Sequence, residues 1–262
     1  ISPSFYIGMA GIAAVVRSSK LKVRNSKNYT FSEVGSGKTS NYRGVHDAGF
    51  IYKVTNSDVS FENSENNASI DSVLADISGF VKLASSSKIS FLNSSNNGSF
   101  TTYDGLASGF VTTCSNKGTL IFESSYNNGN IASRKTSDSG YLSYATIAGG
   151  FVGSNAGCSM HFENSVNDGE INAGHAGGFV GENRTKIDFY DCINRGKITS
   201  INSSYYSPLA GGFIAYDSSQ TLTMKNNYIE GLISGYFAGG FISQRDGKGL
   251  ANIEAIHNKE KI

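Results

Sequence analysis

Residues 148–171 read AGGFVGSNAGCSMHFENSVNDGEI, and residues 176–198 repeat the same pattern as AGGFVGENRTKIDFYDCINRGKI. Each stretch begins with Ala-Gly-Gly-Phe-Val, continues with Phe-x-x-x-x-Asn, and ends on Gly and Ile. Self-similarity at a period of about 20 to 50 residues is typical of solenoids and other repeat architectures. This repeat is therefore the feature of the sequence that decides the fold.

The Gly-Phe-Val phrase recurs along the whole chain, for example as ISGFVK at 77–82 and AGGFIA at 210–215, with a weaker copy, MAGIAA, at 9–14. The glycine before the aromatic position is Gly11, Gly49, Gly79, Gly109, Gly150, Gly178, Gly212 and Gly240, at intervals of 28 to 41 residues. We therefore expect about eight structural repeats, each of one interval.

A second phrase follows each of these glycines after 11 to 13 residues, as in FENSVN at 162–167. Apolar and polar residues alternate at its start, for example at Ile89 and Phe91, which predicts a half-buried strand. Its sixth position is occupied by Asn28, Asn66, Asn96, Asn127, Asn167, Asn194 and Asn258, and only Ile229 interrupts the series. Because no stretch shows a sustained 3.6-residue periodicity, we expect almost no helix.

These segments predict an all-β chain, 1–262, that forms a single parallel β-solenoid with three strands per coil. Each strand would pair with its counterpart one coil away, at a spacing of about 4.8 Å. The stacked asparagines would then form a side-chain ladder, and would also cap the turns, where Asn tolerates a left-handed conformation. Glycine would supply positive φ at the bends.

The repeats differ in length almost entirely between the last apolar segment of one unit and the next Gly-Phe. The insertions are 32–47, 132–147 and 199–209, and the repeat places all three at one edge of the solenoid. Tyrosine beside Ser, Gly and Asn is typical of adaptable recognition surfaces, including surfaces that bind glycans. The candidate ligand-binding residues are Tyr42, Arg43, Arg134, Tyr141, Tyr144, Tyr205 and Tyr206. The alternative is that the insertions are neutral and merely tolerated at the surface.

Composition excludes several function classes. The net charge is only +1, which argues against a nucleic-acid partner, and no apolar run reaches the length of a membrane span. The chain carries 31 Gly but only 2 Pro and as many as 16 Phe, so it can build both hydrogen-bonded ladders and a core. The three cysteines, Cys114, Cys158 and Cys192, suggest buried thiols rather than a disulfide framework or a zinc site.

No catalytic or metal-binding constellation emerges, and we expect no cofactor. The stretch SEVGSGKT at 32–39 has Ser32 where a phosphate-binding loop needs Gly, and no helix pattern follows it. Asp188 and Asp191 have no acidic counterparts at the same positions of the neighbouring repeats. The four histidines occupy different repeat positions, and threonines form no regular array of the kind that an ice-binding face would need. A polysaccharide-cleaving enzyme remains the alternative of another class.

Six Asn-x-Ser/Thr sequons occur, at Asn28, Asn67, Asn93, Asn97, Asn183 and Asn202. In a secreted eukaryotic chain such sites can carry glycans. Asn28 belongs to the asparagine series and Asn93 to the same turn motif, so we expect both to be inaccessible.

The phrases AGGFVGSN and AGGFVGEN, alternating with FENSVNDGEI and FYDCINRGKI, resemble the GLUG-type repeats of bacterial and protist surface proteins. They are also similar to the repeats of polymorphic outer-membrane proteins and related adhesins, although Phe stands here where GLUG repeats prefer Leu. The resemblance implies a right-handed parallel β-helix in a secreted or surface-anchored protein, often an adhesin, and it carries over no catalytic residue.

We therefore expect an extracellular or cell-surface rod that presents variable loops to a glycan or protein. Both ends of the chain interrupt the pattern, which predicts a slice of a longer solenoid. Unpaired strand edges at the ends would also permit end-to-end self-association into filaments.

Overall fold

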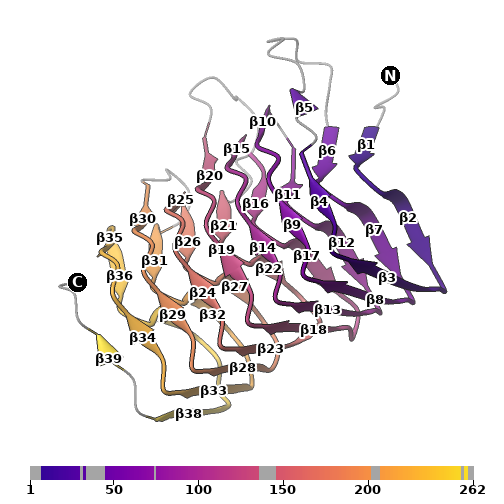
Figure 1. Cartoon of the computed structure of the whole chain (residues 1–262). Helices are drawn as coiled ribbons and strands as arrows, with labels where there is room; N and C mark the ends of the chain where they lie inside the picture. Colours follow the sequence, from indigo (N-terminus) through magenta and orange to yellow (C-terminus); the bar gives the residue numbers. More distant parts are fainter. Residues whose placement is uncertain are drawn as a thin grey trace, which may run out of the picture.

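The computed structural model describes residues 7–29, 32–33, 45–73, 75–135, 146–201, 207–254 and 257–258. Regular structure in these residues consists of β-strands, without any helix. The strands pair in parallel with their counterparts in the previous and the next repeat, so that the chain winds into a stack of coils (Figure 1). The predicted class, an all-β parallel solenoid, is confirmed.

Each coil contributes to five sheets that run the length of the stack, named here sheets A to E in the order in which a coil visits them. Sheet A contains β1 (Ile7–Ala10), β6 (Val45–Ala48), β11 (Ile77–Ser78), β16 (Leu106–Ser108), β21 (Ile147–Gly149), β26 (His175–Gly177), β31 (Leu209–Gly211) and β36 (Phe237–Gly239). Sheet B contains β2 (Ala13–Arg17), β7 (Ile51–Thr55), β12 (Val81–Ser85), β17 (Val111–Ser115), β22 (Val152–Asn155), β27 (Val180–Asn183), β32 (Ile214–Asp217) and β37 (Ile242–Arg245).

Sheet C contains β3 (Lys20–Arg24), β8 (Asp58–Glu62), β13 (Lys88–Leu92), β18 (Thr119–Glu123), β23 (Ser159–Glu163), β28 (Ile187–Tyr190), β33 (Thr221–Lys225) and β38 (Leu250–Glu254). Sheet D contains β4 (Lys27–Asn28), β9 (Glu65–Asn66), β14 (Ser95–Asn96), β19 (Tyr126–Asn127), β24 (Val166–Asn167), β29 (Ile193–Asn194), β34 (Tyr228–Ile229) and β39 (His257–Asn258). Sheet E contains β5 (Ser32–Glu33), β10 (Ile70–Val73), β15 (Phe100–Tyr103), β20 (Ile131–Arg134), β25 (Ile171–Ala173), β30 (Ile198–Ser200) and β35 (Ile233–Ser234).

Within the described residues sheet E has seven strands and the other sheets eight, so complete coils are slightly fewer than the eight predicted. The prediction of three strands per coil was wrong, because the Gly-Phe-Val phrase spans a corner between a strand of sheet A and a strand of sheet B, and the asparagine segment forms a further short strand in sheet D. Sheet A ends at Gly149 and sheet B begins at Val152, so Phe151 lies where the backbone turns. Because the chain turns there, Phe151 and Val152 are both fully buried although they are consecutive.

Two columns of phenylalanine fill the core. The first column comes from the A–B corner and the second from sheet C, where Phe91 pairs in register with Phe61 and Phe122. Within a column the rings stack, as for Phe80 and Phe110 with centroids 4.8 Å apart. Between columns they meet edge to face, as for Phe80 and Phe91 at 5.3 Å. Such aromatic pairs contribute about 0.5–1.5 kcal/mol each beyond the area they bury.

The predicted asparagine ladder is present in sheet D. Each side-chain amide Nδ2 donates to the Oδ1 of the next coil, over 2.8 Å from Asn28 to Asn66 and 2.9 Å from Asn66 to Asn96. The series continues over 2.9 Å to Asn127, 2.7 Å to Asn167 and 2.7 Å to Asn194. Ile229 follows in register and ends it, and the side chain of Asn258 lies outside the described residues.

The turn chemistry differs from the prediction at two points. The ladder asparagines lie in strands, and the left-handed conformation belongs to the residue three positions earlier, as at Asn63 and Asn93, both with φ near 48–49°. The corner glycines, as at Gly79 and Gly150, need no positive φ. They are required because a Cβ at Gly150 would overlap the backbone oxygen of Gly178 in the next coil and the side chain of Asn167.

Serine has a structural place that the sequence did not reveal. The residue after each left-handed corner is a buried serine in most coils, as at Ser64, Ser94 and Ser125. Its backbone N–H donates to the serine Oγ of the next coil, over 3.3 Å from Ser64 to Ser94. The hydroxyl donates in turn to a backbone oxygen of its own coil, over 3.1 Å from Ser94 to Leu92. These bonds satisfy the backbone groups that the turn removes from the sheets.

The prediction that all three cysteines are thiols was wrong. Cys114 and Cys158 form a disulfide with a Cα–Cα distance of 5.9 Å, and Cys192 is a buried free thiol. Cys114 is in register with Asn155, three residues before Cys158, so the bond joins two neighbouring coils at the B–C corner. The sequence separation of 44 residues becomes a contact only through coil stacking.

Candidate functional site: the insertion edge and the A–B corner

All three insertions lie at the same edge, between sheet E and sheet A, as predicted. They are narrower than the predicted ranges, because the strands β5, β6, β20, β21, β30 and β31 take up part of them. In coils without an insertion the connection is short, and a single residue, Gly174, separates β25 from β26. The edge therefore tolerates long and short connections on one repeating scaffold.

Of the seven candidate ligand-binding residues, only Arg134 lies within the described residues. Its exposed side chain lies at the end of β20, and it is in register with Tyr103 of the preceding coil. The other candidates, Tyr42, Arg43, Tyr141, Tyr144, Tyr205 and Tyr206, lie outside the described residues.

The outer side of the A–B corner, which borders this edge, holds a polar cluster that sequence reasoning missed. His175 is the first residue of β26, and its Nδ1 lies 2.8 Å from Oε1 of Glu182 in β27. Their side chains are only 11% and 12% exposed. Glu182 also lies 3.9 Å from Arg184, measured from Oε2 to the guanidinium NH2.

Tyr216, from the next coil, extends this cluster. It is in register with Glu182, its ring centroid lies 6.4 Å from that of His175, and its hydroxyl donates to Asp246 over 3.1 Å. Burial, followed by the hydrogen bond to Asp246, raises the pKa of Tyr216 above its ordinary value. The phenol therefore remains a neutral donor at physiological pH. Glu182 and Tyr216 share one repeat position, the third residue of their sheet B strands, which is the signal the sequence offered.

A second cluster occupies the same corner nearer the N-terminal end. Lys82 is nearly buried and its Nζ lies 3.3 Å from Asp76 Oδ2 and 5.7 Å from the centroid of the Tyr52 ring. Asp76 also accepts the backbone N–H of Leu106 over 3.0 Å. Burial, followed by the charge of Asp76, raises the pKa of Tyr52. In such a cluster the carboxylates can accept hydrogen bonds from a hydroxyl-rich ligand, and the aromatic rings can stack on it.

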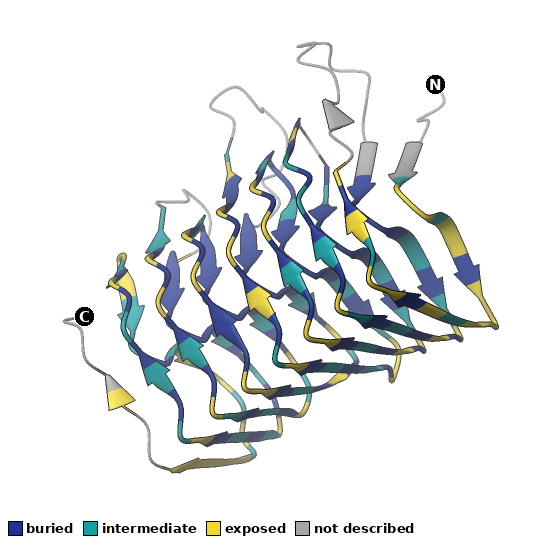
Figure 2. Ribbon diagram, in the orientation of Figure 1, coloured by how far each residue is buried: buried dark blue, intermediate teal, exposed yellow. Residues whose placement is uncertain are grey.

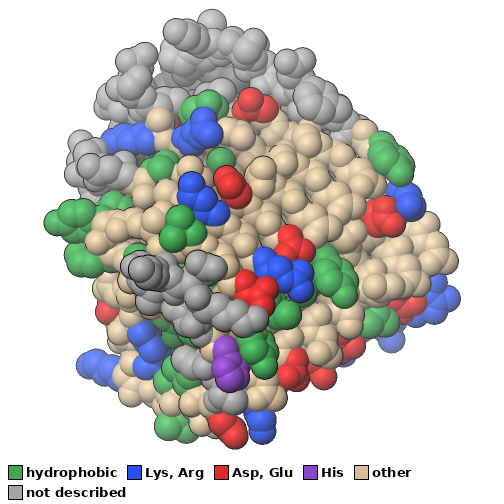
Figure 3. All heavy atoms as spheres, turned by 60° about the vertical axis from the view of Figure 1, so that its left-hand side comes forward, with side chains coloured by type: hydrophobic (Ala, Val, Ile, Leu, Met, Phe, Trp, Pro, Cys, Tyr) green, Lys and Arg blue, Asp and Glu red, His purple; other side chains and the backbone are tan. Residues whose placement is uncertain are grey.

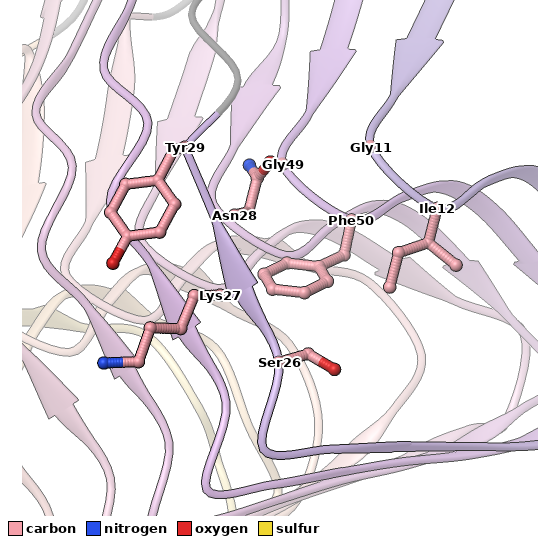
Figure 4. A pocket seen from close by; sticks show the side chains of 8 residues that line it. All are labelled: Gly11, Ile12, Ser26, Lys27, Asn28, Tyr29, Gly49 and Phe50. Atoms are coloured by element: carbon pink, nitrogen blue, oxygen red, sulfur yellow. The ribbon is translucent and has the colours of Figure 1, made fainter.

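A hollow at the N-terminal end of the solenoid is lined by Gly11, Ile12, Ser26, Lys27, Asn28, Tyr29, Gly49 and Phe50 (Figure 4). Phe50 and Asn28 belong to the aromatic column and the asparagine ladder, so this hollow is the end of the core.

Among the described residues no group of three or more His, Cys, Asp or Glu is arranged to hold a metal ion. No helix in the described part of the chain is long and apolar enough to cross a membrane. Comparisons with protein families, with curated proteins and with solved structures gave no match.

Proposed function

We propose that this protein is a noncatalytic extracellular or cell-surface β-solenoid that presents its insertion edge, together with the A–B corner, to a glycan or protein ligand. The observation that carries the proposal is that all three insertions join sheet E to sheet A and to no other sheet. Binding residues concentrate in loops that a rigid scaffold positions, and one edge of a stack places such loops in a row.

Two further features support the proposal. The disulfide between Cys114 and Cys158 is typical of proteins in oxidising compartments such as the cell exterior. The stacked rings and the buried asparagine ladder make a stiff core, because every coil is held by side chains as well as by backbone. An adhesin-like role, which the repeat resemblance implies, requires such a rod.

The test compares the protein with a variant in which 34–44, 136–145 and 202–206 are each replaced by Asp-Gly, the dipeptide that joins β15 to β16. Both are applied to a glycan array and to a panel of extracellular proteins, and thermal unfolding is measured. We expect binding by the protein only, with similar melting temperatures. Equal binding by both would contradict the proposal, and release of shortened saccharides would instead favour a polysaccharide-cleaving enzyme.

End-to-end self-association is a second candidate, favoured by apolar side chains on the last coil. Phe237, Leu250 and Ile253 are 47%, 72% and 45% exposed, and β38 is exposed along its length (Figure 2). Exposed strand edges with apolar side chains promote pairing with another chain. Sedimentation velocity tests this candidate: concentration-dependent polymers that Leu250→Ser and Ile253→Ser abolish would support it, and a monomer at all concentrations would exclude it.

A further inference from the structure

The first coil has a charge pattern unlike the rest of the chain. Residues 7–29 contain five basic side chains and no acidic one, whereas the whole chain has 22 Lys and Arg against 21 Asp and Glu. Elsewhere basic side chains often lie beside acidic ones, as where Arg195 lies between Asp168 and Glu230. Figure 3, in which the C-terminal side comes forward, shows acidic and basic side chains interspersed. The positive charge is therefore concentrated on one coil.

Three of these cations form a straight row on the outer face of sheet C. In β3 the apolar Leu21 and Val23 are more buried, and the side chains between and beside them are exposed. We call Lys20, Lys22 and Arg24 the β3 row. Alternate residues of a strand lie about 6.7 Å apart, so the row spans about 13 Å. The side chains of Lys22 and Arg24 are 45% and 59% exposed.

Lys27 extends the row around the corner into sheet D, with a side chain that is 54% exposed. Arg17, at the end of β2, is exposed at the corner before the row. The outer face of a sheet stays accessible whatever stacks on the edge of its first strand, so these side chains remain available to a ligand.

The second coil neutralises this charge only in part. The carboxylate of Glu62 pairs with two cations, because Oε1 lies 2.5 Å from Lys22 Nζ and Oε2 lies 2.8 Å from Arg24 Nε. Glu65 pairs with Lys27, with 3.1 Å between Oε2 and Nζ. Lys20 forms no ion pair within the described residues.

Asp58 is in register with Lys20 on one side and with Lys88 on the other. Counted together, this region has six cations and three carboxylates, an excess of three positive charges: Arg17, Lys20, Lys22, Arg24, Lys27 and Lys88 against Asp58, Glu62 and Glu65.

We propose that the β3 row binds a linear polyanionic glycan, one that carries sulfate or carboxylate groups at regular intervals. A straight row of exposed cations at even spacing matches a linear polymer whose charges recur along its length. Such a ligand would replace Glu62 and Glu65 as the partners of the cations. The free-energy cost of breaking these ion pairs would be small, because exposed ion pairs contribute only about 0–1 kcal/mol. This surface lies on sheet C, away from the insertion edge, so the inference does not depend on the proposed function.

The test measures retention of the full chain on immobilised heparin, on polygalacturonate and on neutral dextran, at increasing salt. The variant carries Lys20→Ser, Lys22→Ser and Arg24→Ser, since Ser60 and Ser90 already occupy the column of Lys22. The control carries Lys186→Ser, Lys197→Ser and Lys225→Ser. These three residues are also exposed, and their replacement changes the net charge by the same amount.

We expect retention on one or both polyanions but not on dextran, weakened by salt because screening shortens the range of exposed charges. The β3 variant should lose about tenfold in affinity, and the control should stay within about twofold of the unmodified protein. Polygalacturonate carries carboxylates alone, whereas heparin carries sulfates as well. Stronger retention on heparin would therefore identify sulfate as the preferred group, and equal or stronger retention on polygalacturonate would identify carboxylate.

Duplex DNA, immobilised in the same way, is a further polyanionic probe. Three outcomes would overturn the inference: no retention of the unmodified protein, equal losses in the two triple variants, or tighter retention on duplex DNA than on heparin and polygalacturonate. Single variants at Lys20 keep the test valid if the triple variant unfolds. Lys20→Arg should retain binding, and Lys20→Ser should weaken it about threefold.

Discussion

Asn127 forms hydrogen bonds both to the neighbouring coils and within its own coil. Its Nδ2 donates over 2.7 Å to Asn167 in the next coil and over 3.0 Å to the carbonyl of Gly129 in its own coil. Its Oδ1 accepts from Asn96 of the previous coil. The side chain therefore fixes both the spacing between coils and the turn that follows sheet D.

Replacing Asn127 with Ala should lower the free energy of unfolding by about 3 kcal/mol. The change leaves the Oδ1 of Asn167 buried without its donor, and an unsatisfied buried polar group costs about 1–3 kcal/mol. Urea denaturation measures the effect. Asn128→Ala is the matched control, because Asn128 donates to Asn97 over 2.8 Å on the exposed side and should cost under about 1 kcal/mol. Equal losses would show that the ladder does not stabilise the stack.

Cys192 occupies the serine column between Ser165 and Asn227, and burial raises its pKa to about 12 from 9.0. Because the folded value is raised, its contribution to stability is complete below pH 9 and is lost as the pH rises toward 12. Between pH 8 and pH 11 the free energy of unfolding of the unmodified protein should fall by about 3 kcal/mol more than that of the Cys192→Ser variant. The pH then rises about two units above the pKa of the unfolded thiol, which corresponds to about 2.7 kcal/mol. Thermal unfolding at both pH values measures this, and parallel losses would contradict it.

At the scale of elements, the strands in which apolar and polar residues alternate could be predicted from the sequence, and the short strands could not. Sheet C strands such as β13 show the pattern in Ile89 and Phe91, and their register follows from the repeat. The strands of sheets A and D are two to four residues long, which is too short to show a period. The five-sheet coil thus became visible only in three dimensions, as did the serine columns.

The accessibility of the Asn93 sequon, which lies at a corner, was also predicted wrongly from the sequence. We expected its side chain to be inaccessible because it shares a turn motif with the ladder. The left-handed φ at this corner turns the side chain outward, so Asn93 is exposed, whereas Asn28 is buried as expected.

The disulfide joins two elements that the sequence keeps 44 residues apart. In denaturant and without reductant, the protein from an oxidising compartment should show one reactive thiol per chain, and three after reduction. Reduction should lower the free energy of unfolding by about 2–4 kcal/mol, because it frees a long loop in the unfolded chain. Cys192→Ser should show no thiol before reduction. Three thiols in the unreduced protein would contradict the bond.

At the scale of the whole molecule, the insertion edge followed from the repeat lengths, whereas the A–B corner did not. His175 and Glu182 are seven residues apart on different strands, and Tyr216 joins them from the next coil. No local pattern brings such residues together, because the turn at Phe179 and the stacking of coils together create the contact. The same stacking places the β3 row on a face that the insertions do not reach.

Every described repeat forms one coil, and the coils stack in register at a constant spacing. Leu92 and Lys225 lie in one outward column of sheet C, joined in register through Glu123, Glu163 and Tyr190. Four steps of about 4.8 Å place their backbones about 19 Å apart, although 133 residues separate them in sequence.

Spin labels on Leu92→Cys and Lys225→Cys, in a Cys192→Ser background, test this by double electron–electron resonance. The stacked solenoid predicts a single narrow distribution that corresponds to about 19 Å between the backbones. A broad distribution, or a maximum beyond about 30 Å, would contradict in-register stacking over these coils.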